Sequence, residues 1–113
     1  MKSEIKGNAV IYNIEEHFDD TFAAFFYDDL NSYVNSKYYN YIIDIASNVR
    51  IESAKFAALL LSLNAYCLKN KGFLVISTQN TDLINFLKLI KVIDNFKIID
   101  SLEKAMAKYI KQK

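Results

Sequence analysis

The sequence predicts an α/β fold, with a mixed, mostly parallel sheet of about five strands and about four helices. Short apolar runs alternate along the chain with longer segments in which apolar residues recur at helical spacing. Chains that alternate strands and helices form right-handed crossovers and largely parallel sheets. The chain has 113 residues, so we expect one domain over residues 1–113.

The first half of the chain predicts a hairpin, a helix and a strand. Residues 3–6 and 9–14 flank Gly7, which tolerates the positive φ of a tight turn, so the first strand is expected to be an antiparallel edge. A helix is predicted from residue 19 to about 35, because its first residues are acids and a threonine that favour helix starts. Residues 41–46 form the short apolar run typical of a buried strand.

The second half continues the alternation. Gly72 is predicted to end a helix, as glycine often does at the C′ position. The predicted elements are a helix over 53–69, a strand over 73–77, a helix from 80 to about 91, a strand over 96–99 and a closing helix capped by Ser101.

The helix over 53–69 carries two neighbouring apolar stripes, and they leave two interpretations. Ala57, Leu60, Leu61, Asn64 and Leu68 form the first stripe, and Phe56, Leu59, Leu63 and Tyr66 form the second. The second stripe is either buried under a neighbouring helix or exposed as a face for a partner.

Charge and hydropathy exclude several kinds of partner. The net charge is +1, without the basic excess that binding to nucleic acid usually requires. No apolar run approaches the roughly 20 residues that span a bilayer, and the first residues do not form a signal core, so we expect no membrane insertion and a cytoplasmic protein. Cys67 is the single cysteine, and its apolar neighbours predict a buried side chain.

The residues also give no support for catalysis. No cysteine and histidine cluster has zinc spacing, and the two glycines cannot form a phosphate-binding loop. The acids near His17 fall where a strand meets a helix, a place where acids favour the helix dipole. We therefore expect no metal, no cofactor, no catalytic residue and no enzymatic activity.

One segment carries a family resemblance. Residues 42–60, Ile-Ile-Asp-Ile-Ala-Ser-Asn-Val-Arg-Ile-Glu-Ser-Ala-Lys-Phe-Ala-Ala-Leu-Leu, place an acid–serine pair between a buried strand and an apolar helix. This resembles the signature of the STAS family, which includes the anti-sigma factor antagonists, where Asp-Ser-Ser/Thr-Gly-Leu begins a helix. Residues 71–76, 86–92 and 96–105 are similar to the later strands and helices of that family. The key motif departs from it: Glu52 replaces aspartate and Lys55 replaces glycine.

The resemblance implies a single STAS-like domain in a bacterial signalling protein that controls transcription by binding a protein partner, an anti-sigma factor or serine kinase. Ser53 aligns with the serine that partner kinases phosphorylate, so control by phosphorylation is expected there. A phosphate at a helix N-terminus would place negative charge beside the docking surface. The expected partner-binding residues are Asp19, Asn48, Arg50, Glu52, Ser53, Lys55, Phe56, Leu59 and Leu63.

Three alternatives stay open. Ser53 is equally consistent with an ordinary helix cap, in a non-phosphorylated accessory or scaffold subunit of a stress-signalling or lipid-transport complex. A small-ligand or nucleotide-binding module would use the same loop, without support from any motif. An exposed apolar patch would also favour a homodimer.

Overall fold

The computed structural model describes residues 1–110, with five strands, four α-helices and a short 3-10 helix. The strands are β1 (Lys2–Lys6), β2 (Ala9–Ile14), β3 (Asn40–Ile45), β4 (Phe73–Thr78) and β5 (Lys97–Ile99). The helices are α1 (Asp20–Asn35), α2 (Lys55–Lys69), α3 (Thr81–Leu89), η1 (Ile93–Asn95) and α4 (Leu102–Tyr109). The predicted order is confirmed, although α2 begins two residues later than expected and α3 ends earlier.

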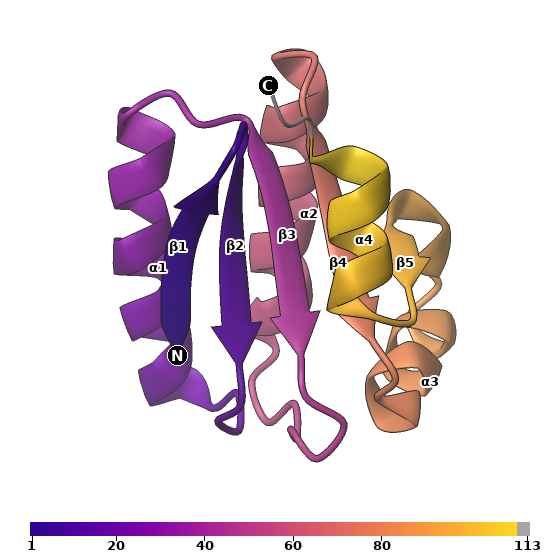
Figure 1. The fold of residues 1–113 in the computed structure, drawn as a ribbon. Coiled ribbons are helices and arrows are strands. Elements are labelled where there is room, and N and C mark those ends of the chain that lie inside the picture. The colour runs from indigo at the N-terminus through magenta and orange to yellow at the C-terminus, as the bar shows by residue number, and fades with distance from the viewer. Residues whose placement is uncertain (111–113) are drawn as a thin grey trace.

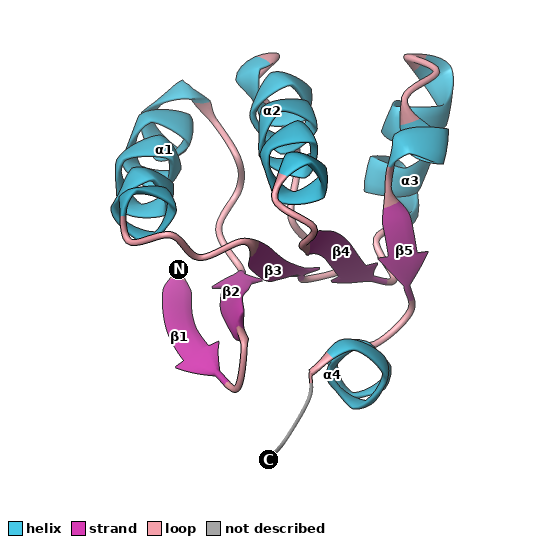
Figure 2. Ribbon diagram, turned by 90° about the horizontal axis from the view of Figure 1, so that it is seen from above, coloured by secondary structure: helices cyan, strands magenta, loops and turns pink. Residues whose placement is uncertain are grey.

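The strands form one sheet in the order β1-β2-β3-β4-β5 (Figure 1). β1 pairs antiparallel with β2, and all other neighbours are parallel, so the predicted antiparallel edge is confirmed. Gly7 has a φ of 57° in the hairpin turn, which glycine adopts without strain. Because the parallel strands follow one another in sequence, right-handed crossovers place α1, α2 and α3 on the same face (Figure 2).

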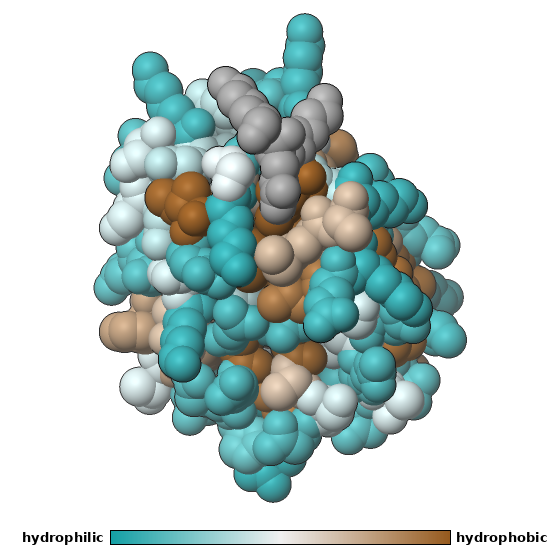
Figure 3. Space-filling view, viewed as in Figure 1, coloured by the Kyte–Doolittle hydropathy of each residue, from teal (hydrophilic) through white to brown (hydrophobic). Residues whose placement is uncertain are grey.

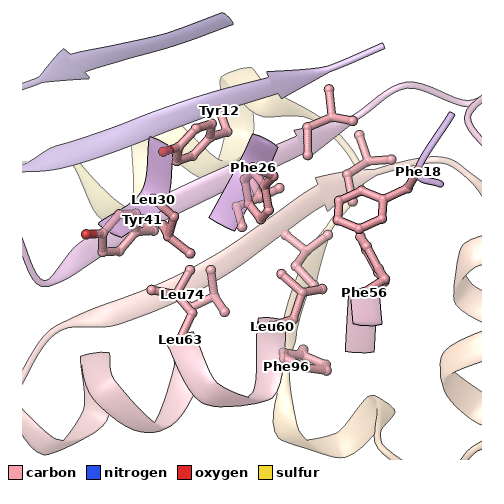
Figure 4. Packing of buried hydrophobic residues seen from close by; sticks show 14 of the residues in the cluster. Tyr12, Phe18, Phe26, Leu30, Tyr41, Phe56, Leu60, Leu63, Leu74 and Phe96 are labelled. Atoms are coloured by element: carbon pink, nitrogen blue, oxygen red, sulfur yellow. The ribbon is translucent and has the colours of Figure 1, made fainter. Parts of the chain in front are cut away.

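The core has two layers, one on each face of the sheet. Val10, Tyr12 and Ile14 pack against α1 to α3, while Ile11 points to the α4 side, as the alternation along this strand predicts. Figure 4 shows the larger layer, in which aromatic side chains of β2, the β2–α1 loop and α1 meet those of α2. On the other face, Ala105 of α4 is fully buried against the sheet.

The α4 face is only partly covered by a helix. α4 packs mainly against β3, β4 and β5, and Ile11 of β2 belongs to the buried cluster around Ala105. β1, at the edge of the sheet, lies away from α4 (Figure 2). Figure 3 shows that hydrophilic side chains cover most of this face and that apolar side chains gather beside α4. Among residues 1–110, no helix has the length and apolar character needed to cross a membrane.

The end of α2 corrects one sequence prediction. The left-handed residue after this helix is Lys71, with a φ of 61°, and not Gly72. Gly72 follows it, and its N–H donates to the Cys67 carbonyl at 2.7 Å. A Cβ at Gly72 would lie 1.9 Å from the Tyr39 carbonyl oxygen. Glycine is therefore needed there for the close approach of two backbone segments, and the prediction of its role as the C′ residue was wrong.

Candidate functional site

Five of the nine predicted site residues lie beyond the carboxyl ends of β2 and β3, in the β2–α1 loop (residues 15–19) and the β3–α2 loop (residues 46–54), and the other four lie on α2. Figure 1 shows both loops at the lower edge of the sheet. Parallel strands run in the same direction, so the loops that follow them emerge at one edge. This places Asp19 on one loop and Asn48, Arg50, Glu52 and Ser53 on the other, at the same end of the molecule.

The two loops pair with one another beyond the sheet. The Phe18 N–H donates to the Arg50 carbonyl at 2.8 Å, and the Glu52 N–H donates to the Phe18 carbonyl at 2.8 Å. This forms a parallel bridge between Phe18 and Ile51. The Arg50 N–H also donates to Nδ1 of His17 at 3.0 Å. These hydrogen bonds hold the backbone of the β3–α2 loop in place. In an unstructured loop the same backbone groups would bond to water.

Asn80 holds the same loop from its other side. Its Nδ2 donates to the Val49 carbonyl at 2.7 Å and to the Ala46 carbonyl at 3.1 Å, while its Oδ1 accepts from the Leu83 N–H at 3.0 Å. The side chain is buried, so each of these bonds satisfies a group that water does not reach. The sequence predicted Asn80 only as a helix cap, because the loop contacts lie more than 30 positions away along the chain.

Ser53 joins the beginnings of two helices. Its Oγ donates to Oδ1 of Asp20 at 2.6 Å and accepts from the Lys55 N–H at 3.2 Å. The N-cap of α2 is Ala54, which has no side-chain cap bond, so the prediction of Ser53 as an ordinary N-cap was wrong. From the position before the N-cap, the hydroxyl binds the N–H of the first residue of α2 and ties it to the first turn of α1. Ser53 is 4% exposed, so its hydroxyl is enclosed in this conformation.

The predicted docking residues differ in exposure. The exposed ones are Asp19, Asn48, Arg50, Glu52 and Lys55; Leu59 is half-buried, and Ser53, Phe56 and Leu63 are buried.

Phe56 and Leu63 belong to the core. They are 1% and 3% exposed, so the expectation that they form an open docking surface was wrong for these two side chains. The reason is the orientation of α2, whose inward face carries Phe56, Leu60, Leu63 and Cys67 at helical spacing. Figure 4 shows Phe56 beside Phe18, and their ring centroids are 4.7 Å apart in an edge-to-face arrangement.

A groove runs between α1 and α2 next to these loops. Its volume is about 650 Å³, and its lining is mostly apolar. Small residues make the space, since Ala24 of α1 faces Ala58 and Ser62 of α2 across it. Leu59 lies in its wall and Lys55 at the end nearest the β3–α2 loop. The second apolar stripe of α2 thus supplies partly exposed groove residues as well as core residues.

In the part of the chain that the structure describes, no group of three or more histidine, cysteine or acidic residues could hold a metal ion. Burial raises the pKa of the Cys67 thiol to about 12, so it stays protonated at neutral pH. In open α/β sheets small ligands bind where the strand order reverses, whereas β2 to β5 follow one another in order.

Comparisons with known proteins identify the fold. Neither a known family model nor a curated protein sequence matches the chain. Among solved structures, a crystal structure of a "putative anti-sigma factor antagonist" (TM1081) from Thermotoga maritima matches with a TM-score of 0.81 at 18% identity, over 95% of this chain and 92% of that chain. An NMR structure of the protein TM1081 matches with a TM-score of 0.69 at 18% identity, over 93% of this chain and 84% of that chain. At this identity the shared property is the fold, and it extends over nearly the whole of both chains. The chain therefore has the fold of the anti-sigma factor antagonists of the STAS family.

Proposed function

We propose that the protein is a non-enzymatic regulator that binds a protein partner, as an anti-sigma factor antagonist does, in the cytoplasm of a bacterial cell. The docking surface is the β3–α2 loop with the first turns of α2. It presents exposed Asn48, Arg50, Glu52 and Lys55 beside half-buried Leu59. Polar groups around a smaller apolar centre are typical of interfaces between proteins that also exist separately.

The observation that carries this proposal is the fixed backbone of the β3–α2 loop. The β2–α1 loop holds it on one side and Asn80 holds it on the other. A loop that is already ordered loses little conformational entropy on binding, so more of the contact energy becomes affinity. The exposed side chains on this loop take no part in holding it. Arg50 Nε and Glu52 Oε1 form a 3.7 Å ion pair, which is weak at an exposed site.

The test is capture of the partner from the native cell. We expect the wild-type protein to retain a protein that Arg50→Glu loses, because a reversed charge on the loop opposes the partner's complementary charge. Lys69→Glu is the matched control: it reverses an exposed cation at the far end of α2 and should retain the same protein. With the purified partner, Arg50→Glu should weaken binding by about tenfold or more, which is about 1.4 kcal/mol. Equal retention by all three proteins would contradict the assignment of the surface.

Two modes of binding fit this surface: permanent docking, and docking controlled by phosphorylation of Ser53. The burial of Ser53 favours permanent docking. In this mode Ser53 has only a structural role at the start of α2, and the protein acts as an accessory or scaffold subunit of a stress-signalling or lipid-transport complex. The enclosed hydroxyl and its bond to Asp20 support this mode, because a kinase needs the hydroxyl to be accessible. Ser53→Ala should then leave the affinity for the captured partner unchanged, apart from any loss of stability.

The second mode is phosphorylation of Ser53, and the contact with Asp20 favours it for a different reason. A phosphate would remove the hydrogen that Ser53 donates and would place two negative charges next to the Asp20 carboxylate. Repulsion would separate the first turns of α1 and α2, after the residues around Ser53 have opened to a kinase. Incubation with the captured kinase and ATP should add phosphate at Ser53, found by mass spectrometry and absent in Ser53→Ala. If no phosphate is added, or if Ser53→Asp binds the partner as tightly as wild type, this mode is wrong.

A further inference from the structure

Charged side chains are divided unevenly between the two ends of the sheet. Next to the amino ends of the parallel strands, the turns and helix ends carry exposed lysines, namely Lys6, Lys37, Lys69, Lys71 and Lys108. The segments around these lysines contain no acidic residue, over 5–9, 36–41, 66–75 and 105–110. Figure 1 shows the turns at the upper edge of the sheet, opposite the β2–α1 and β3–α2 loops. We call these five residues the lysine end.

Two residues of the lysine end are held in a strained conformation. Lys37 and Lys71 follow α1 and α2 with φ values of 66° and 61°, in the left-handed region that glycine adopts without strain. The helix dipole favours a cation near a helix C-terminus, but Lys69 and Lys108 already have this benefit in the last turns of α2 and α4. The chain therefore keeps two further charges at this end at a cost in stability.

The charges of the lysine end are open to a partner. Lys6 forms a 3.7 Å ion pair with Glu4, and within residues 1–110 the other four lysines form none. Apolar surface lies among them, because Leu68 is 61% exposed in the last turn of α2, directly before Lys69. Tyr39 and Tyr109 are half-buried in the same turns. Lysine beside leucine and tyrosine is typical of surfaces that lie where lipid headgroups meet acyl chains.

We propose that the lysine end binds the surface of an anionic membrane, with its cations against the lipid headgroups and Leu68 at the boundary of the acyl chains. Lysines attract anionic lipids without the fixed geometry that recognition of a single phosphate requires. A nucleic acid fits less well, because it offers no apolar layer to Leu68. Arginine is also the cation that nucleic-acid recognition favours, and the single arginine, Arg50, lies at the opposite end.

This orientation leaves the proposed docking surface free. The β2–α1 loop, with acidic Glu15, Glu16 and Asp19, lies at the opposite end of the sheet and would face away from an anionic membrane. No helix within residues 1–110 could cross a membrane, so the contact is with the surface of one leaflet. The inference does not rest on the proposed function, because purified protein and lipid vesicles are enough to test it.

Flotation with lipid vesicles tests this inference. Vesicles that contain phosphatidylglycerol should carry the protein, vesicles of phosphatidylcholine alone should not, and high salt should weaken the binding because it screens the charges. Leu68→Trp introduces the only tryptophan of the chain, and its emission should shift to shorter wavelength when anionic vesicles are added. Failure to bind anionic vesicles would overturn the inference, and binding to a DNA duplex instead would show that the lysine end serves nucleic acid.

Glycine variants separate lipid binding from folding. Lys37→Gly and Lys71→Gly each remove one cation and relieve the left-handed strain, so both should unfold at a higher temperature than wild type. Each should also bind anionic vesicles about fivefold more weakly. Lys91→Gly is the matched control. Lys91 also has a φ of 61°, but α3 has nine residues against the 15 of α2, so it ends about 9 Å short of the lysine end.

The control variant decides between this surface and a general effect of charge. Lys91→Gly should gain stability in the same way and bind the vesicles as wild type does. An equal loss of vesicle binding in all three variants would overturn the assignment to the lysine end. So would unchanged binding in Lys37→Gly and Lys71→Gly.

Discussion

Ser53 Oγ donates a hydrogen bond to Asp20 Oδ1 at 2.6 Å, and this bond connects the first turn of α1 to the residue before the N-cap of α2. The two residues are 33 positions apart, yet the paired β2–α1 and β3–α2 loops bring them together. The bond lies next to the proposed docking surface and at one end of the α1–α2 groove, so it is the first contact to test.

The Ser53–Asp20 bond should appear as a coupling energy. Ser53→Ala and Asp20→Ala should each lower the free energy of unfolding, and the double variant should lose less than the sum of the two. We expect a coupling of about 1 to 2 kcal/mol, because one partner is a carboxylate. Urea unfolding of the four proteins measures it. Strictly additive losses would show that the bond does not stabilise the fold.

Asn80 should contribute more stability than any exposed residue of the loop that it holds. Asn80→Ala removes a helix cap and leaves the carbonyls of Ala46 and Val49 without their donor, so the free energy of unfolding should fall by about 2 to 3 kcal/mol. Asn48→Ala, an exposed change in the same loop, should stay within about 0.5 kcal/mol of wild type. Similar values for both variants in urea unfolding would contradict this role of Asn80.

The two residues after α2 should respond in opposite directions. Gly72→Ala introduces a Cβ that overlaps the Tyr39 carbonyl, so it should lower the unfolding free energy by at least about 2 kcal/mol. Lys71→Gly places glycine at a φ of 61°, and it should raise that free energy by about 1 kcal/mol. Thermal unfolding of both variants checks the pair, and a stable Gly72→Ala protein would refute the close approach.

The Cys67 thiol should make stability fall at high pH. Its pKa rises from the ordinary value of 9.0 to about 12 in the folded protein, because burial disfavours the thiolate. The stability that the protonated thiol contributes is therefore complete below pH 9 and is lost as pH rises toward 12. Over this range the free energy of unfolding should fall by up to about 1.4 kcal/mol per pH unit. Burial also raises the pKa of Tyr12 and Tyr41 above their ordinary value of 10.0, so they add to the decline at higher pH.

Urea unfolding between pH 7 and pH 11 measures this dependence. In Cys67→Ala the decline should begin about one pH unit later, because only the tyrosines remain. A thiol reagent at pH 8 should leave native Cys67 unmodified and label it after unfolding. Rapid labelling of the native protein would show that the thiol is accessible, against its place in the core.

The order of elements was predictable because local signals determine it. The alternation in residues 9–14 identified which side chains of β2 face each layer, and the caps of α1, α3 and α4 came from their polar first residues. These signals act within a few residues, so one sequence is enough to show them. The sequence did not signal η1, a single turn without a periodic pattern of its own.

The site was harder to predict because it depends on contacts between distant residues. Both apolar stripes of α2 fit a core face, and the buried face takes Ala57 and Leu60 from one stripe and Phe56 and Leu63 from the other. Contacts with distant residues, such as that of Phe56 with Phe18, set this orientation. No local pattern indicates that Asn80 reaches the β3–α2 loop, or that Ser53 meets Asp20. For the same reason, Gly72 was taken for a helix end when the constraint is the backbone of Tyr39.

The most direct test of the docking surface is a map of amide shifts in the isotope-labelled protein as the captured partner is added. The proposal predicts that the largest changes fall in residues 48–59, in the β3–α2 loop and the first turns of α2. Changes centred on β1 or α4 instead, with this segment unaffected, would contradict it.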